Sequence, residues 1–284
     1  MKKIAIIPNA SKDGAVDVLL LVAKKIYENG ATALVNQKYL YACKDFATPY
    51  TQFPSECDLI IVIGGDGSVI DASQLAVRYD IPILGVNIGH LGYLAEIEPD
   101  SLNTLDRLFK NEYKFEEKML LSAIRKINGE EVEVSERYAV NDVIISHESY
   151  LGVADFTLIT DDKEMVKYRA DGIIFSTPAG STAYSLSAGG PVVDHGINSI
   201  LVTPICPHSF FNRSIIFNEN SVLIIKNTGN STLKISIDGR CFAVLYSGEE
   251  CVVQKSLKSL KMLAFNDNNM FSTLFSKMKK IENI

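Results

Sequence analysis

The 284-residue sequence lacks a surplus of basic residues, long apolar segments and paired cysteines. Its 28 Lys and Arg against 34 Asp and Glu give a formal charge of −6, which speaks against a nucleic-acid or membrane partner, because basic patches hold phosphate backbones. No apolar segment approaches the roughly 18 residues that cross a bilayer. The four apolar residues ahead of Pro8 are too few for the core of a signal peptide, so we expect a cytoplasmic protein.

Several chemical motifs are also absent. The five cysteines include no CxxC pair and the four histidines lack zinc-ligand spacing, so buried thiols are expected rather than a structural zinc. The sequence has no Gly-Lys step, which excludes a Walker-A motif, and protein-kinase signatures are missing. The Rossmann pattern GxGxxG is incomplete because Ile70 occupies its third glycine position. Phosphate binding would therefore have to use a different motif.

The first 115 residues alternate short apolar segments with helical patterns. Apolar residues make up 47% of the chain, which is enough for a sizeable core. We predict strands at residues 3–7, 31–35, 58–63 and 82–86, and helices at residues 15–29, 68–79 and 101–110. Uniformly apolar strands between helices favour a mainly parallel sheet covered on both faces. The sequence therefore predicts an N-terminal α/β domain over residues 1–115.

The pattern changes after about residue 115. Leu233, Ile235 and Ile237 alternate with polar residues, which is typical of half-buried antiparallel strands. Turn-forming pairs punctuate this part of the chain at Asn128-Gly129, Asp161-Asp162, Gly229-Asn230 and Asp238-Gly239. We therefore predict a β-rich, sandwich-like domain over residues 116–265. A helical tail over residues 266–284 is expected to pack back on the N-terminal domain.

The first candidate site is the turn Gly64-Gly65-Asp66-Gly67, which joins a predicted strand to a predicted helix. Glycines let the backbone approach an anion closely, and the first N–H groups of the helix would face the contents of the turn. Asp66 could accept a proton from a hydroxyl or hold a metal ion. This arrangement suits phosphoryl transfer, although the four residues alone are equally compatible with an ordinary tight turn.

The second candidate is a run of small residues from 177 to 191 that follows another predicted strand. Ser181 or Thr182 could cap a short helix, and Tyr184 offers a ring on which a flat ligand could stack. The alternative is a small-residue helix that packs tightly on the sheet. Ahead of the run, Arg169 and Asp171 share one face of a strand, either as charges beside a groove or as a surface ion pair.

The third candidate is Asn141-Asp142, two polar residues inside an apolar β segment. A carboxylate accepts from both vicinal hydroxyls of a ribose, while an amide both donates and accepts. The pair therefore suits a ribose, and the alternative is a bulge or turn whose side chains satisfy backbone groups.

With these three clusters in this order, the sequence resembles the bacterial NAD kinases of the ATP-NAD kinase family over about residues 58–240. Segments 87–94, 204–208 and 236–239 support the resemblance, and the run TPAGSTAYSLSAGGP is its most specific part. The resemblance implies an α/β N-terminal domain that carries the nucleotide phosphates and a β-rich domain that binds NAD. It also implies transfer of the γ-phosphoryl of ATP to the 2′-hydroxyl of the adenosine ribose of NAD, which gives NADP and ADP, with a divalent cation, Mg²⁺, as cofactor.

The resemblance also implies residue roles. Asp66 would be the catalytic base, and Gly64, Gly65 and Gly67 would lie near the ATP phosphates. The residues implied in NAD binding are Asp66, Gly67, Asn141, Asp142, Arg169, Asp171, Ala179, Thr182, Ala183, Tyr184, Ser185, Leu186 and Ser187. A homo-oligomer, either a dimer or a tetramer, is implied as well, with some of these contacts made to a neighbouring subunit.

The sequence departs from the family pattern at two positions and leaves two alternatives open. Arg240 stands where many members have Gln, Tyr93 stands where Phe is usual, and the sequence assigns no role to His208. For Asp238-Gly239, a hairpin turn and a ligand contact are equally compatible with the pattern. The alternative functions are a lipid or sphingoid-base kinase, which would need an apolar tunnel, and a dinucleotide-binding sensor without turnover.

Overall fold

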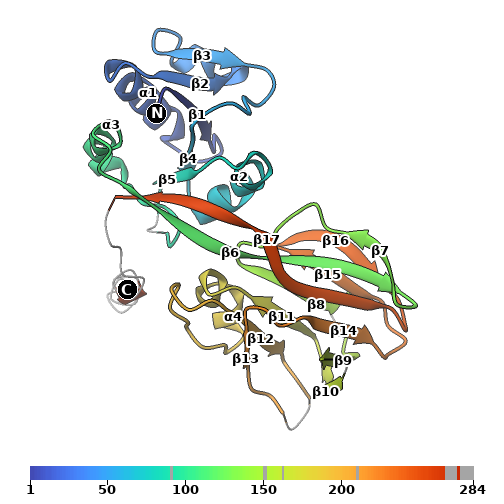
Figure 1. Ribbon diagram of the computed structural model, residues 1–284. Helices are drawn as coiled ribbons and strands as arrows, with labels where there is room; N and C mark the ends of the chain where they lie inside the picture. The colour runs from blue at the N-terminus through green and yellow to red at the C-terminus, as the bar shows by residue number, and fades with distance from the viewer. Residues whose placement is uncertain (90–91, 150–151, 162, 209–210, 266–273, 276–284) are drawn as a thin grey trace. The chain divides into compact units, whose positions relative to one another are not determined.

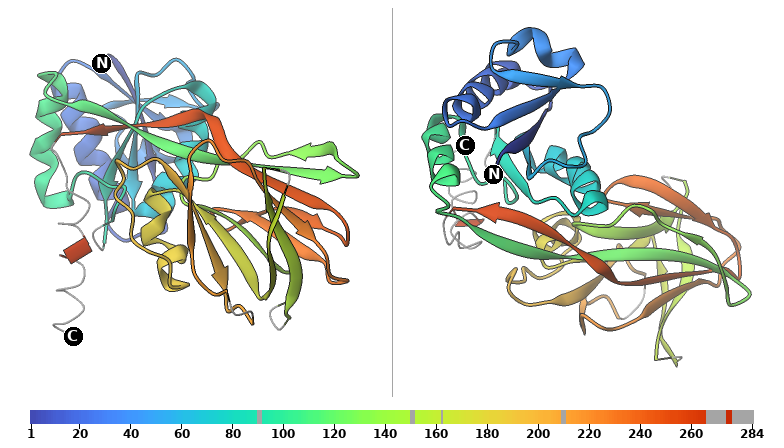
Figure 2. Two further views of the ribbon diagram at one scale, coloured as in Figure 1. Left: turned by 60° about the horizontal axis from the view of Figure 1, so that its bottom comes forward. Right: turned by 45° about the horizontal axis from the view of Figure 1, so that its top comes forward.

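A computed structural model describes residues 1–89, 92–149, 152–161, 163–208, 211–265 and 274–275 (Figure 1). The chain divides into two compact units: unit 1 comprises Met1–Glu117 and the segment that begins at Leu260, and unit 2 comprises Lys118–Ser259. Two strands, β6 (Lys114–Ile127) and β17 (Glu250–Ala264), continue from one unit into the other. They pair with each other and run side by side in both views of Figure 2.

Unit 1 is an α/β domain built on a parallel sheet. The strands lie in the order β5 (Ile83–Asn87), β4 (Leu59–Gly64), β1 (Lys3–Pro8), β2 (Thr32–Asn36) and β3 (Ala47–Tyr50). Every residue of β4 and β5 is buried, as their uniformly apolar sequences predict for central parallel strands. The prediction of an N-terminal α/β domain with a mainly parallel sheet is confirmed.

Helix α1 (Ala15–Glu28) packs against this sheet through one face. Its buried residues recur at the spacing of a helical stripe: Ala15, Val18, Leu19, Val22, Ala23 and Ile26. The helix ends at Asn29, and Gly30 follows with a φ of 73°, a left-handed conformation that glycine adopts without steric cost. The predicted helix is therefore present, and a glycine follows its C-terminus as predicted.

Three local features of unit 1 differ from the sequence-based expectation. Helix α2 (Asp66–Tyr79) begins two residues earlier than the predicted residues 68–79, so Asp66 belongs to its first turn. The predicted helix at residues 101–110 is instead a 3₁₀ segment, η2 (Pro99–Leu105), followed by one α-helical turn, α3 (Asp106–Phe109). Strand β3 was not predicted, because its sequence, ATPY, has no apolar periodicity. It lies at the edge of the sheet, where a strand buries fewer side chains.

A further 3₁₀ segment, η1 (Gln37–Ala42), links β2 to β3.

Unit 2 is a sandwich of two antiparallel sheets. One sheet holds β10 (Lys163–Ala170), β9 (Ala154–Thr160), β14 (Leu223–Asn227) and β17, with β6 and β7 (Glu130–Val134) alongside. The other holds, in order, β13 (Ile215–Asn218), β12 (Ser199–Ile205), β11 (Gly172–Ser176), β8 (Asp142–His147), β15 (Leu233–Ile237) and β16 (Arg240–Leu245). Figure 1 shows β6 and β17 crossing in front of β8 and β15. The predicted β-rich, sandwich-like second domain is confirmed as a fold class.

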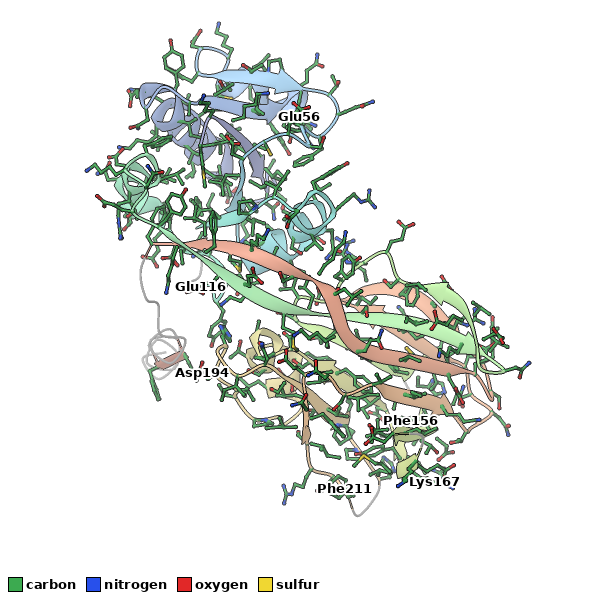
Figure 3. The ribbon with its side chains drawn as sticks, viewed as in Figure 1. Glu56, Glu116, Phe156, Lys167, Asp194 and Phe211 are labelled. Atoms are coloured by element: carbon green, nitrogen blue, oxygen red, sulfur yellow. The ribbon has the colours of Figure 1, made fainter. Side chains whose placement is uncertain are left out.

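The core of unit 2 lies between the two sheets. Leu233, Ile235 and Ile237 are fully buried, in agreement with their period-two pattern, and they share one cluster with Phe156 and Phe175 from other strands. Figure 3 labels Phe156 in this core and Lys167 on the exposed face of the edge strand β10. The alternation of apolar and polar residues in β15 therefore separates the side chains that face the core from those that face away from it.

Two of the predicted turns are two-residue hairpins. Asn128 and Gly129 join β6 to β7 with φ values of 51° and 85°, and Asp238 and Gly239 join β15 to β16 with φ values of 46° and 75°. Positive φ at both central residues defines the type I′ turn that Asn-Gly and Asp-Gly favour. The Gly229-Asn230 turn instead connects β14 to β15, which belong to different sheets.

Unit 2 spans Lys118–Ser259, whereas the sequence predicts a second domain over residues 116–265. The difference lies mainly at its end, because β17 continues into unit 1, where Met262 pairs with Ile83. Most of the expected tail helix over residues 266–284 lies outside the described residues. Among the residues that the structure describes, no helix is long and apolar enough to span a membrane.

We predict that Phe156→Ala lowers the free energy of unfolding of unit 2 by about 3–5 kcal/mol, because it removes a fully buried ring and leaves a cavity. The fully exposed Leu257, on β17 in the same unit, provides the control, since Leu257→Ala should change this free energy by less than about 0.5 kcal/mol. Urea unfolding followed by circular dichroism measures both. Equal effects of the two substitutions would contradict the placement of Phe156 in the core.

Candidate active site

The Gly64–Gly67 turn joins strand β4 to helix α2. Gly64 is the last residue of β4, Gly65 precedes the helix in an extended conformation, and Asp66 and Gly67 are the first two helical residues. A Cβ atom at Gly64 would lie 2.3 Å from Ser68 Oγ, so only glycine fits this close approach. A Cβ atom at Gly67 would meet nothing within 4 Å, which means that the turn is open on that side. The first N–H groups of a helix have no partner within it, so the turn presents donors to an anion.

The carboxylate of Asp66 is held from the segment that follows β5. Its Oδ2 accepts a hydrogen bond from the backbone N–H of Tyr93 at 2.9 Å, and its Oδ1 accepts one from the N–H of Leu94 at 3.0 Å. These two bonds fix the orientation of the carboxylate while leaving further lone pairs on both oxygens. Burial, and to a lesser extent the negative charge of Asp66, raises the pKa of the Tyr93 hydroxyl.

Gly92 makes this arrangement of Asp66 sterically feasible. A Cβ atom at position 92 would lie 2.0 Å from Asp66 Oδ1, well inside contact distance. Any larger residue there would displace the carboxylate or the segment that holds it. Gly92 belongs to segment 87–94, which supports the family resemblance, but its contact with Asp66 was not predictable from the sequence because it joins residues far apart in the chain.

A cavity of about 580 Å³ lies beside the turn, entirely within unit 1. Its lining comes from the residues after β1, from the turn and from the first part of α2: Ile7, Pro8, Asn9, Lys12, Val62, Gly65, Asp66, Gly67, Ser68, Asp71, Ala72 and Leu75. Three of the four residues of the predicted phosphate turn therefore face this cavity, whereas Gly64 packs behind it against Ser68. Asn9 and Lys12 were missed from the sequence, although the carboxyl end of β1 is expected to lie beside that of β4 in a parallel sheet.

In unit 2, Asp238 holds the backbone of the Asn141-Asp142 segment. Its carboxylate accepts hydrogen bonds from three consecutive N–H groups, those of Val140 (2.8 Å), Asn141 (2.9 Å) and Asp142 (3.1 Å). The Asp238-Gly239 pair is thus a hairpin turn, and its Asp side chain also shapes the neighbouring candidate site. Burial raises the pKa of Asp238, and the three N–H donors act in the opposite direction.

Asn141 and Asp142 differ in their surroundings. Asn141 is half-buried, whereas the Asp142 residue is only 5% exposed at the start of β8. Burial, followed by the nearby charge of Asp238, raises the pKa of Asp142 to about 7. Asp142 therefore carries a proton more readily than an ordinary aspartate does.

The small-residue run lies directly against Asn141. The backbone N–H of Thr177 donates to the Asn141 carbonyl at 2.9 Å, and Thr177 Oγ1 donates to the Val140 carbonyl at 2.6 Å. A Cβ atom at Gly180 would lie 2.1 Å from the Asn141 oxygen, so the run needs glycine at this point. The structure thus brings the second and third sequence clusters together.

The run forms two short turns rather than one capped helix. These are the 3₁₀ segment η3 (Ala179–Thr182) and the single turn α4 (Tyr184–Ser187). The predicted capping role of Ser181 or Thr182 is wrong, because both residues lie inside η3 and their hydroxyls donate back to the preceding turn. Ser181 Oγ also accepts from the N–H of Val193, which ties the run to the loop that follows it.

The residues of the run expected to bind NAD fall into two groups. Tyr184, Leu186 and Ser187 are exposed and Thr182 and Ala183 are half-buried, so these side chains can reach a ligand. Ala179 is 8% exposed, and Ser185 is fully buried with its Oγ 3.1 Å from Thr203 Oγ1. The Ser185 hydroxyl therefore makes a contact in the protein interior and is not exposed to a ligand.

Arg169 and Asp171 lie around the end of β10, with Ala170 between them, and both are exposed. In the described part of the chain neither side chain forms an ion pair, so the surface-pair interpretation is wrong. The backbone N–H of His208 donates to the Arg169 carbonyl at 2.7 Å, which gives His208 a structural contact here. Arg240, the first residue of β16, is also exposed.

The chain thus combines an α/β unit, whose acidic glycine turn lies beside a cavity and suits an anion such as a nucleotide phosphate, with an antiparallel sandwich that carries a small-residue run. The model of the ATP-NAD kinase N-terminal domain matches residues 4–113, and that of the ATP-NAD kinase C-terminal domain matches residues 140–265. The chain belongs to the ATP-NAD kinase family, and it is an enzyme, a kinase that phosphorylates NAD with ATP as co-substrate.

Individual relatives agree with this assignment. The NAD kinase of Thermoanaerobacter sp. (strain X514) is 33% identical over 284 residues, which cover 98% of this chain and 99% of that protein. The NAD kinase of Magnetococcus marinus is 36% identical over 231 residues, which cover 80% of this chain and 75% of that protein. The preference for this family over lipid or sphingoid-base kinases is therefore confirmed.

Two solved structures share the fold. Yeast NADH kinase complexed with NADH superposes with a TM-score of 0.84 at 22% identity, covering 96% of this chain and 86% of that one. An NAD kinase from Archaeoglobus fulgidus in complex with ATP superposes with a TM-score of 0.74 at 22% identity, covering 98% of this chain and 99% of that one. At this identity the two superpositions establish the fold alone.

We predict that Asp142→Asn changes the pH dependence of the stability of unit 2. The pKa of Asp142 is raised from 3.8 to about 7, so the folded state retains a proton that the unfolded state releases. Its contribution to stability is present below about pH 4 and is lost as the pH rises to about 7. Wild type should therefore lose stability relative to Asp142→Asn across this window.

Urea unfolding at pH 4.5, 6.0 and 7.5 measures this difference. Asp194→Asn removes an exposed carboxylate of the same unit, labelled in Figure 3, and controls for the loss of one charge. A difference between wild type and Asp142→Asn that stays constant with pH would contradict the prediction.

Proposed function

We propose that the Gly64–Gly67 turn of unit 1 is the phosphoryl-transfer centre of this enzyme and that Asp66 is its base. In this reaction the 2′-oxygen of the adenosine ribose of NAD forms a bond to the γ-phosphorus of ATP. The bond from that phosphorus to the β,γ-bridging oxygen breaks, which releases ADP, and the hydroxyl proton passes to a carboxylate oxygen of Asp66. One observation carries the proposal: the Asp66 carboxylate is fixed by two backbone amides and lines an open cavity at the start of α2.

The rate would depend mainly on positioning and charge neutralisation, as in other phosphoryl transfers. The bonds from Tyr93 and Leu94 support such a role, because they hold the base at one position without consuming all of its acceptor capacity. Gly65 and Gly67 would present the open backbone of the turn to the ATP phosphates, and Gly64 would allow the turn to close behind them.

We assign NAD binding in unit 2 to Asn141 and to the accessible part of the small-residue run. The exposed ring of Tyr184 can stack on a flat ligand, and Thr182, Ala183, Leu186 and Ser187 provide small or accessible neighbours. Asp142, Ala179 and Ser185 are buried. We propose that these three residues contribute to NAD binding through their backbone atoms or by orienting neighbouring side chains. The exposed Arg169 and Asp171 would add opposite charges.

The cavity fits a divalent cation that is carried mainly by the substrate. Mg²⁺ binds in nucleotide sites through one or two carboxylates together with substrate phosphates. Among the described residues, no group of three or more acidic, His or Cys side chains could hold a metal, and Asp71 is the carboxylate beside Asp66 in the cavity. Asp71 would therefore supply the protein ligand, and the ion would neutralise phosphate charge when bound.

Two further assignments extend the proposal. A homo-oligomer, dimer or tetramer, would allow the exposed Arg169 and Asp171 to serve the site of a neighbouring subunit. A cytoplasmic location would suit the five cysteines, all of which are free thiols, because that compartment keeps thiols reduced.

We predict that Asp66→Asn lowers kcat by about 10²–10⁴-fold while NAD affinity stays within about threefold, because only the proton acceptor is lost. A coupled assay with a dehydrogenase that responds only to NADP measures turnover, and NAD binding is measured by calorimetry. Asp17→Asn changes an exposed carboxylate on α1 and should leave both quantities unaltered.

Two outcomes would be decisive against this proposal. Near-normal turnover in Asp66→Asn would remove Asp66 from the role of base. A folded wild-type protein that binds NAD but forms no NADP with ATP and Mg²⁺ would contradict the assignment of the Gly64–Gly67 turn as a phosphoryl-transfer centre.

We also predict that Gly92→Ala lowers kcat by at least about tenfold, because the added methyl group would overlap Asp66 Oδ1 and displace the base. The same coupled assay measures the effect, and circular dichroism shows whether the fold is retained. Gly196→Ala, where the added Cβ would lie 3.3 Å from the nearest atom, Asp194 Oδ1, is the matched control. Full activity in a folded Gly92→Ala variant would contradict the importance of this contact.

A further inference from the structure

Lys12 extends across the carboxyl ends of three neighbouring strands in unit 1. It lies in the turn between β1 and α1, and its Nζ donates to the carbonyl of Ile88, just after β5, at 2.9 Å. Strand β4 lies between β1 and β5 in the sheet. The side chain must therefore pass over the end of β4, where the Gly64–Gly67 turn begins.

Distances to the glycines support this placement of the ammonium group. A Cβ atom built at Gly65 would lie 2.9 Å from Lys12 Nζ, and one built at Gly89 would lie 3.7 Å from it. Lys12, Gly65 and Asp66 all line the same cavity of about 580 Å³. The absence of a side chain at position 65 leaves the ammonium next to the backbone of the turn.

Lys12 has no carboxylate partner in the part of the chain that the structure describes. The residue is half-buried, and among the residues that the structure describes no carboxylate lies within ion-pair distance of its Nζ. Both carboxylate oxygens of Asp66 already accept backbone N–H groups. An ammonium has three donors, of which the Ile88 carbonyl takes one, so Lys12 retains charge and donors for an anion in the cavity.

The turn that carries Lys12 is itself held in place. Asn9 Nδ2 donates to Ser68 Oγ at 2.9 Å, and Asn9 Oδ1 accepts from the hydroxyl of Ser11 at 2.6 Å. The backbone N–H of Lys12 donates to the Asn9 carbonyl at 3.0 Å. The backbone at Lys12 is thus connected to the first turn of α2. Because Nζ also donates to the Ile88 carbonyl, the side chain is restricted as well, and ligand binding costs less side-chain entropy than it would for a free lysine.

We propose that Lys12 is a substrate-binding residue whose ammonium contacts a phosphate oxygen of the polyphosphate tail of ATP at the Gly64–Gly67 turn. This inference rests on the proposed position of the ATP phosphates at that turn. A compact ammonium suits the role, because it can donate to the Ile88 carbonyl and to a phosphate oxygen in different directions. The residue would fix the donor phosphates from the side of β1, while Asp66 acts on the acceptor hydroxyl.

The test compares Lys12→Met, which removes charge and donors at similar length, with Lys12→Arg, which keeps them. Loss of one charged hydrogen bond to phosphate should raise the KM for ATP by about 10–100-fold in Lys12→Met. The KM for NAD should stay within about twofold, and Lys12→Arg should recover most of the lost ATP affinity. Lys24→Met, at an exposed position on α1, is the control and should leave both constants unaltered.

Inhibition by inorganic tripolyphosphate distinguishes contacts to the phosphates of ATP from contacts to its adenosine, because tripolyphosphate carries no adenosine. It should inhibit wild type competitively with ATP, and Lys12→Met should weaken this inhibition by about the same factor as it raises the KM for ATP. Inhibition by adenosine should be unaffected. Lys12→Gln, which keeps a donor but loses the charge, gives a second neutral variant and should behave like Lys12→Met.

The outcomes distinguish this inference from the proposed function. An unaltered KM for ATP, or an equal increase in the KM values for ATP and NAD accompanied by a lower Tm, would overturn the phosphate contact and leave Lys12 only its bond to Ile88. Either result would leave the role of Asp66 intact, because that role is judged from the turnover of Asp66→Asn. Inhibition by tripolyphosphate that is equal in wild type and Lys12→Met would overturn the inference as well.

Discussion

The candidate active site depends on one pair of charge-assisted hydrogen bonds: the Asp66 carboxylate at the start of α2 accepts a hydrogen bond from each of two backbone N–H groups in the segment after β5. This contact joins the carboxyl ends of two adjacent strands, because β4 leads into Asp66 and β5 leads into Tyr93 and Leu94. It fixes the position of the Asp66 carboxylate at the edge of the cavity, and it requires glycine at position 92.

Unit 2 uses the same kind of contact for a different purpose. Asp238 accepts three consecutive backbone N–H groups at residues 140–142, so a carboxylate again holds a site segment that is distant in sequence. Asp238 sits deep enough for burial to raise its pKa, and its charge contributes to the raised pKa of Asp142. In unit 1 the held carboxylate faces a cavity, which gives it access to a substrate. The same kind of interaction therefore leaves one aspartate lining a cavity and the other buried in the fold.

Local patterns carried most of what the sequence could predict. Apolar strands, the α1 stripe and the Asn-Gly and Asp-Gly turns depend on neighbouring residues, so β4, α1 and the two type I′ hairpins were predictable. The run at 177–191 was recognisable from its small residues, but the capping role of Ser181 or Thr182 was wrong, because the non-helical Ala183 divides the run into two turns and both residues lie inside the first. The Asp238 contact, the Gly92 constraint and the position of Lys12 all join segments 25 or more residues apart, which no local pattern encodes.

The closeness of Gly92 to Asp66 also has an evolutionary consequence. Glycine is the only residue without a Cβ atom, so every substitution at position 92 introduces an overlap with the carboxylate at position 66. A side chain at position 92 therefore requires a smaller residue, or a displaced carboxylate, at position 66. The two positions are expected to vary together among related sequences, with glycine at position 92 wherever aspartate is kept at position 66 in this conformation.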